Sequence, residues 1–251
     1  MATSVADIPR LEVAGLVKRF REKTAVDRLD LTIAPGELVG LIGPNGAGKS
    51  TTVKVITGQL LGDEGTIRVG GHDIRFDPLA ARRLTGYVPQ DVVLYPFLTG
   101  REVLQFVAEV HGLEPNVARP RIDELLARFA LTPAQNRMTR EYSEGMARKL
   151  AIAVALVGEP ELLVLDESLN GLDPRAAAEV KQIIRDRMAA GTAILWVSHM
   201  LEVVASLASR VVVMDSGRLV GELSREAMDE RAARGETLED FFLAHTTDTG
   251  S

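Results

Sequence analysis

The stretch Gly43-Pro44-Asn45-Gly46-Ala47-Gly48-Lys49-Ser50-Thr51 decides the fold of this chain. The apolar run 38–42 before it reads as a buried strand, and residues 49–56 after it can continue as a helix. Glycines permit backbone angles closed to other residues, so successive N–H groups of the loop can point at one anion. The helix start adds free N–H groups and partial positive charge. In this strand–loop–helix context, the pattern G-x-x-x-x-G-K-[ST] predicts a nucleotide-binding loop rather than a chance glycine-rich turn. Lys49 would reach the terminal phosphates, and the Ser50 hydroxyl would ligate Mg²⁺.

Length and composition bound the class of protein. The 251 residues suffice for one large α/β domain or two small ones. The chain has 29 Lys and Arg against 35 Asp and Glu, with no dense basic tract, so no nucleic-acid-binding face is expected. The absence of cysteine excludes disulfides, thiolate catalysis and cysteine-based metal sites.

Two further patterns concern the location of the protein. Residues 1–10 carry Asp7 and lack an apolar core segment, which is unlike a signal peptide. The longest apolar runs fall short of the ~20 residues that a membrane span needs. We therefore expect a soluble, cytosolic protein.

The order of the remaining segments predicts an α/β core interrupted by helices. Strands are expected at 11–20, 25–33, 66–69, 162–165, 193–197, 211–214 and 218–220. Between about 101 and 156 the apolar residues recur at helical spacing, with Pro115, Pro120 and Pro133 punctuating the helices. The continuously apolar runs 162–165 and 193–197 suit strands of a parallel sheet that helices cover on both faces. A further helix is expected from Pro174 to Ala190, and a loose tail from Thr246.

Polar residues follow two of these buried strands. Asp166 and Glu167 end the run 162–167, and His199 ends the run 193–199. Ligands of parallel α/β sheets lie beyond the carboxyl ends of the strands, so these side chains should face the same site as Lys49. Asp166 suits support of Mg²⁺, Glu167 suits activation of the attacking water, and His199 suits contact with the γ-phosphate. The alternatives are two solvated loop acids and a structural histidine. Gln90 carries an amide oxygen able to touch Mg²⁺ or water.

At these residues the chain resembles the ATP-binding subunits of ABC (ATP-binding cassette) transporters, from about Leu11 to Glu222. The resemblance rests on six motifs in order: the phosphate loop, Gly86-Tyr87-Val88-Pro89-Gln90 like the Q-loop, Tyr142-Ser143-Glu144-Gly145-Met146 like the signature motif, Leu162 to Glu167, Asn170-Gly171-Leu172-Asp173 like the D-loop, and His199 like the switch histidine. Phe20 stands where the family has an aromatic residue that stacks on adenine, although Phe20 could equally be a core residue of its strand.

The resemblance implies a P-loop NTPase (RecA-like) core with a parallel sheet, N-terminal antiparallel strands and an inserted helical subdomain, all in one domain spanning 1–251. The core would comprise about 8–89 and 160–222, the helical subdomain about 90–159, and a short helical tail about 223–251. It also implies a head-to-tail dimer, with ATP between the phosphate loop of one subunit and the signature motif of the other.

The site residues that this resemblance implies fall into three groups. Catalysis would rest on Glu167, His199 and Lys49. Mg²⁺ would be held by Ser50, Gln90 and Asp166. Nucleotide contacts would come from Phe20, Val26, Gly43, Pro44, Asn45, Gly46, Ala47, Gly48, Lys49, Ser50, Thr51, Gln90, Ser143, Gly145 and Asp173.

The signature motif departs from the family's common Leu-Ser-Gly-Gly-Gln at three positions. Tyr142 replaces Leu, Glu144 replaces the first Gly, and Met146 replaces Gln. Ser143 can cap the following helix, but Met146 cannot close a capping box with it. Glu144 would lower phosphate affinity if it faced the nucleotide, and would suit the helix N-terminus if it faced solvent. We expect hydrolysis to survive, and we expect Glu144→Gly to leave activity equal or raise it.

The leading interpretation is a transport motor that uses MgATP and acts through separate membrane subunits. It would pair with a second ATP-binding subunit and lie on the cytoplasmic face of the cell membrane. The form Ser-x-Gly-Met resembles that of exporter-type subfamilies. One alternative is a soluble ABC-type ATPase acting on ribosomes or DNA, although those resemble paired cassettes or carry long coiled insertions. Another is a nucleotide-binding regulator without turnover, against which Glu167 and His199 argue.

Overall fold

A six-stranded sheet forms the centre of the protein, which is described here from a computed structural model over residues 8–169 and 171–246. The strand order is β10-β9-β3-β8-β7-β6. Every neighbouring pair from β9 to β6 is parallel, and β10 pairs antiparallel with β9. The strands are β3 (Leu38–Ile42), β6 (Thr85–Val88), β7 (Leu162–Asp166), β8 (Ala193–Val197), β9 (Arg210–Asp215) and β10 (Arg218–Ser224).

A second sheet of four antiparallel strands has the order β2-β1-β4-β5. Its strands are β1 (Leu11–Phe20), β2 (Lys23–Ile33), β4 (Glu64–Val69) and β5 (His72–Asp73). This agrees with the expectation of antiparallel N-terminal strands and a parallel core sheet.

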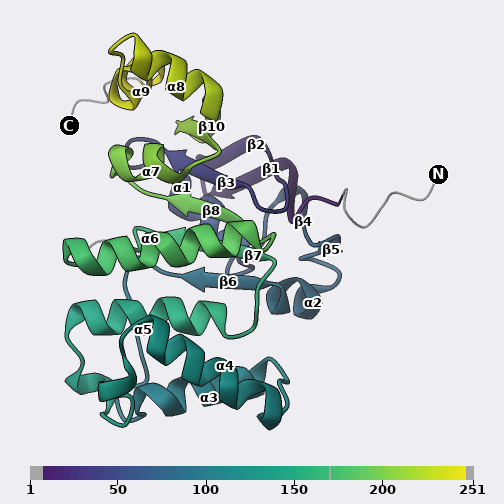
Figure 1. The fold of residues 1–251 in the computed structure, drawn as a ribbon. Coiled ribbons are helices and arrows are strands. Elements are labelled where there is room, and N and C mark those ends of the chain that lie inside the picture. Colours follow the sequence, from purple (N-terminus) through teal and green to yellow (C-terminus); the bar gives the residue numbers. More distant parts are fainter. Residues whose placement is uncertain (1–7, 170, 247–251) are drawn as a thin grey trace.

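Helices lie on both faces of the six-stranded sheet (Figure 1). Along the chain, they alternate with its strands. The core helices are α1 (Lys49–Ile56), α2 (Pro78–Arg83), α6 (Pro174–Ala189) and α7 (Leu201–Leu207). Between β6 and β7 the chain forms α3 (Gly100–Val110), α4 (Pro115–Arg128), the 3₁₀ turns η2 (Thr132–Ala134) and η3 (Thr139–Glu141), and α5 (Glu144–Leu156). The last helices, α8 (Arg225–Ala233) and α9 (Leu238–His245), lie at the opposite end of Figure 1 from α3 and α4.

Two apolar cores explain why the central strands are continuously apolar. Along β7, Leu163 and Leu165 belong to the core shared with the helices α3 to α7, whereas Leu162 and Val164 belong to the core shared with α1 and the antiparallel sheet. Because side chains alternate along a strand, each face of the sheet needs its own apolar set. All five residues of β3, β7 and β8 are buried, as the sequence predicted.

Helix α5 lies directly on β6. A Cβ placed on Gly86 would come 2.3 Å from the carbonyl oxygen of Ala155, so only glycine allows this approach of helix to strand. The insertion is therefore attached to the sheet through the C-terminal end of α5.

Several elements of the structure were not predicted from the sequence or lie elsewhere than predicted. No element was predicted for β5 or α2, and residues 86–90 were predicted only as a motif, although Thr85–Val88 is the edge strand β6. Pro120 does not end a helix but lies inside α4. Asn170 and residues 247–251, to which we assigned part of the D-loop motif and most of the tail, lie outside the described residues.

Candidate active site

The phosphate loop joins the buried strand β3 to the start of α1. Gly46 and Gly48 have φ angles of 79° and 109°, which favour glycine. At Gly43 a Cβ would come 2.2 Å from the carbonyl oxygen of Met214, and at Gly48 it would come 2.3 Å from that of Ala25. The loop is therefore pressed against β9 and β2, and three of its glycines are required by geometry.

The Lys49 side chain folds back over this loop. Its Nζ donates hydrogen bonds to the carbonyl oxygens of Gly43 (2.6 Å) and Pro44 (2.9 Å). Burial lowers the pKa of Lys49, while the charges of Glu167 and Asp166 act in the opposite direction. No side chain caps α1 at Gly48, so the first N–H groups of the helix are open to a ligand. The arrangement presents an ammonium group and a helix N-terminus to one anion.

Glu167 and His199 meet at the ends of β7 and β8. His199 Nδ1 lies 2.8 Å from Glu167 Oε1, and the His199 backbone N–H donates to the same oxygen at 3.1 Å. The Ser198 hydroxyl donates to Glu167 Oε2 at 3.4 Å. Glu167 has a left-handed φ of 49°, an unfavourable conformation for a non-glycine residue that is typical of functional sites. The carboxylate is thus held by three groups from the neighbouring strand end.

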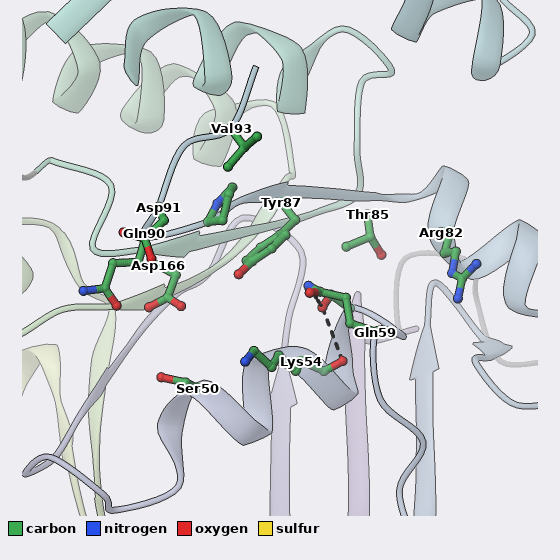
Figure 2. A pocket seen from close by; sticks show the side chains of 12 residues that line it. Ser50, Lys54, Gln59, Arg82, Thr85, Tyr87, Gln90, Asp91, Val93 and Asp166 are labelled. Atoms are coloured by element: carbon green, nitrogen blue, oxygen red, sulfur yellow. Dashed lines mark hydrogen bonds between the residues drawn. The ribbon is translucent and has the colours of Figure 1, made fainter. Parts of the chain in front are cut away.

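Asp166 faces Ser50 across a cavity of about 650 Å³ (Figure 2). Figure 2 shows Ser50 on α1, with the side chains of Asp166 and Gln90 on the opposite side. Burial raises the pKa of Asp166, and the nearby charge of Glu167 raises it further. The hydroxyl, carboxylate and amide oxygens that meet here are the hard donors that Mg²⁺ prefers, so these three residues fit a magnesium ion.

A second cavity of about 320 Å³ lies on the other side of the loop. Its lining comes from the loop, from β2 and from the turn between β9 and β10. Phe20, at the end of β1, is 45% exposed, so it is not a core residue and its ring is open to stacking. The Lys18 ammonium lies 5.3 Å from the centre of that ring. Val26 is a correction to the expected nucleotide contacts, because its side chain is fully buried (0% exposed) in the core under the loop.

The signature segment begins α5, distant in sequence from the loop. Ser143 caps this helix by accepting a hydrogen bond from the Met146 N–H at 3.3 Å. The Tyr142 hydroxyl donates to the Ala134 carbonyl at 3.0 Å, and its ring packs against Gly100. The Met146 side chain packs on the helical core. Two of the three departures from the family motif therefore stabilise the chain's own helical insertion.

Asp173 has a structural role within the chain, whereas no described contact of Gly145 requires a glycine. The Asp173 carboxylate caps α6 by accepting from the N–H groups of Arg175 and Ala176, both at 3.0 Å, and these bonds lower its pKa. A Cβ on Gly145 would meet no described atom closer than 3.8 Å, so the chain itself does not require a glycine there.

Two residues that organise the site were not predicted from the sequence. Ser198 holds Glu167, and its place beside His199 was the available signal. Arg148 is buried one turn into α5 and donates from Nη1 to the Gln90 carbonyl oxygen at 2.8 Å. A charged residue within a helix otherwise rich in Ala, Ile and Leu was the signal for Arg148.

Among residues 8–169 and 171–246, we find no helix whose length and apolar character would let it cross a membrane. This part of the chain contains the whole of both sheets and the candidate site.

Comparison with known proteins gives one consistent family. The family described as "ABC transporter" matches residues 26–170. The daunorubicin resistance ATP-binding protein DrrA3 of Streptomyces coeruleorubidus is 42% identical over 212 residues, covering 84% of this chain and 67% of that protein. The daunorubicin/doxorubicin resistance ATP-binding protein DrrA of Streptomyces peucetius is 41% identical over 212 residues, covering 84% and 64%. The chain thus spans about two thirds of the length of these relatives.

A solved structure described as the ATP binding subunit of an ABC transporter has 31% sequence identity and a TM-score of 0.87, covering 93% of this chain and 98% of that one. The α/β fold with its inserted helices agrees with this likeness. The chain therefore belongs to the ABC transporter family, as an ATP-hydrolysing subunit that drives transport.

Proposed function

We propose that this chain binds MgATP at a head-to-tail dimer interface and uses its hydrolysis to drive export through separate membrane subunits. The observation that carries the proposal is the convergence of three strand ends. The loop after β3 brings Lys49, the end of β7 brings Asp166 and Glu167, and the end of β8 brings His199. Each of these residues has a distinct task in phosphoryl transfer to water.

In the proposed reaction, the loop N–H groups and the Lys49 ammonium neutralise the phosphates. Glu167 accepts the proton of a water molecule while the water oxygen bonds to the γ-phosphorus. The bond from phosphorus to the bridging oxygen breaks, so ADP and inorganic phosphate leave. His199 and Ser198 hold the Glu167 carboxylate during this step, as their contacts of 2.8 Å and 3.4 Å support. His199 is also largely exposed, which leaves its ring free to touch the γ-phosphate.

Ser50, Asp166 and Gln90 would hold Mg²⁺, with Asp166 acting through bound water. When bound, the ion supplies positive charge to the phosphate oxygens. Their meeting across one cavity supports this assignment.

The second half of each ATP site would come from the start of α5 in another subunit. The N-cap Ser143 and the open surface at Gly145 support an approach by a phosphate group from outside the chain. The partner would be a second copy of this chain or a related subunit.

Residues 90–159 would form the helical subdomain that receives the membrane subunits. An exposed apolar surface beside Gln90 supports this proposal: Val93 is 87% exposed, Phe97 is exposed, and the rings of Tyr95 and Phe106 stack edge to face at 5.4 Å. Exposed apolar groups in such number favour a protein interface. Attachment through these subunits would place the chain on the cytoplasmic face of the cell membrane.

Export of drug-like compounds is favoured by two relatives from Streptomyces. Their names describe them as resistance proteins for daunorubicin or for daunorubicin and doxorubicin. These relatives do not favour the alternative of a soluble ATPase acting on ribosomes or DNA.

Co-expression with a candidate membrane subunit tests the proposal. We expect wild-type chain to support both Mg²⁺-dependent ATP hydrolysis and efflux of an anthracycline from vesicles, and Lys49→Ala to lose both. Hydrolysis that is unaffected by the membrane subunit, together with co-sedimentation with ribosomes or DNA, would favour the alternative.

A further inference from the structure

Glu144 points toward a neighbouring segment of its own chain. It is the first residue of α5, directly after the cap Ser143. A Cβ placed on Gly171 would come 2.5 Å from Glu144 Oε1 and 2.9 Å from its carboxyl carbon. Gly171 has a φ of 77°. The carboxylate therefore lies against the backbone of Gly171, where a larger residue would displace it.

The same carboxylate lies near the buried cation Arg148. Glu144 Oε1 is 4.0 Å from Arg148 Nη2, one helical turn away, while Arg148 Nη1 donates to the Gln90 carbonyl. The Arg148 side chain is 8% exposed, and within the described part of the chain its Nε has no hydrogen-bond partner. At 4.0 Å this ion pair is longer than a hydrogen bond, so Glu144 places a negative charge near the buried guanidinium without satisfying its N–H groups.

We propose that Glu144 is a positioning residue for ATP hydrolysis. Its carboxylate holds the start of α5 against Gly171 and orients Arg148 on the Gln90 carbonyl. Glu144 thereby connects the start of α5, which would meet the partner's phosphates, with Gly171 and with Gln90 of its own chain. The inference rests on the proposed function. The Glu144 carboxylate lies beside Gly171 and Arg148 of its own chain.

Glu144 should contribute more to the rate of hydrolysis than to the stability of the fold. The Glu144 side chain is 74% exposed, so its removal should change the free energy of unfolding little. A shift of the α5 start, however, would misplace the groups that meet the γ-phosphate in the closed dimer. The ATP affinity of a single subunit, which depends on the phosphate loop, would be unaffected.

The test is Glu144→Gln in the full chain, which keeps the size of the side chain and removes its charge. We expect kcat to fall by about two- to fivefold, the range of partly exposed ion pairs, with KM for ATP and Tm unchanged. The matched control is Glu141→Gln, which removes an exposed carboxylate 3.7 Å from Arg137 in the same i,i+4 arrangement and should leave kcat unchanged. Glu144→Gly should also lower kcat, contrary to the expectation from sequence alone.

A double-mutant cycle with Gly171→Ala tests the coupling between Glu144 and Gly171. Because alanine also strains the left-handed backbone at Gly171, only the difference between the effects of Glu144→Gln in the two backgrounds is interpreted. Because the added Cβ displaces the carboxylate, Glu144→Gln should have no further effect on kcat in the Gly171→Ala background. Unchanged kcat in Glu144→Gln, or additive effects in the cycle, would overturn the inference. Failure of the proposed function would differ, since wild-type chain would then show no hydrolysis, or hydrolysis that the membrane subunit does not affect.

Discussion

Replacing Glu167 with glutamine should nearly abolish turnover while leaving ATP bound between two subunits. Glutamine keeps the length and shape of the side chain but cannot accept the proton of the attacking water. A positioned general base contributes about 10²- to 10⁴-fold, or about 3–5 kcal/mol of barrier, so kcat should fall by that factor.

The fold should tolerate this change. With the amide oxygen toward the His199 N–H, the new NH₂ group faces the Ser198 hydroxyl oxygen, which can accept a hydrogen bond. Glutamine also adopts the left-handed φ of 49° at the same cost as glutamate. We therefore expect an unfolding free energy within about 1 kcal/mol of wild type.

Phosphate release measures kcat, and size-exclusion chromatography with ATP and Mg²⁺ measures dimer formation. Glu230→Gln, an exposed carboxylate on α8, is the matched control and should behave as wild type. Wild-type turnover in Glu167→Gln would remove Glu167 from the role of general base. Loss of turnover without a trapped dimer would contradict the proposed arrangement of two subunits around ATP.

Three further predictions concern the contact with adenine, the packing of α5 on β6 and the cap of α6. Phe20→Ala should weaken ATP binding by about 5- to 100-fold in calorimetry through lost stacking, whereas Phe20→Trp should retain it; equal affinities would mean that the ring does not contact adenine. Gly86→Ala should lower the unfolding free energy in urea by about 1–3 kcal/mol, because its Cβ would meet the Ala155 carbonyl. Asp173 has a lowered pKa, so its stabilising contribution is present above its ordinary value of 3.8 and is lost as pH falls through the folded value. Asp173→Asn lacks the ionised carboxylate, so its urea midpoint should lie below that of wild type near pH 7, and the difference should shrink near pH 3; a difference that does not change with pH would contradict the cap.

Much of the fold follows from local signals in the sequence. The fully apolar runs of β3, β7 and β8 predict strands covered on both faces, and the glycines of the phosphate loop predict its turn. Short elements gave weaker signals. Strand β6 has four residues, too few to establish a period in the sequence, and α2 has six residues. Pro120 shows why proline is an uncertain boundary: its ring and missing N–H are accommodated within the turns of α4.

The residues of the site were predictable where a motif places them at a strand end, as for Lys49, Glu167 and His199. What could not be predicted is how side chains contact one another across the fold. The bond between Arg148 and the Gln90 carbonyl joins residues 58 positions apart, and it depends on the path of α5 over β6. The full burial of Val26 likewise depends on the packing of β2 under the loop.

The close contact of Gly86 with Ala155 also has a mechanical consequence. Twelve residues separate Ala155 from Ser143, which is about 18 Å along the axis of α5. The helix can therefore act as a lever whose pivot is on the sheet and whose tip carries the cap. A tilt of about 10° at the pivot would move the tip by about 3 Å, roughly one hydrogen-bond length. Small rotations of the insertion would be enough to make or break contact with a phosphate on the partner subunit.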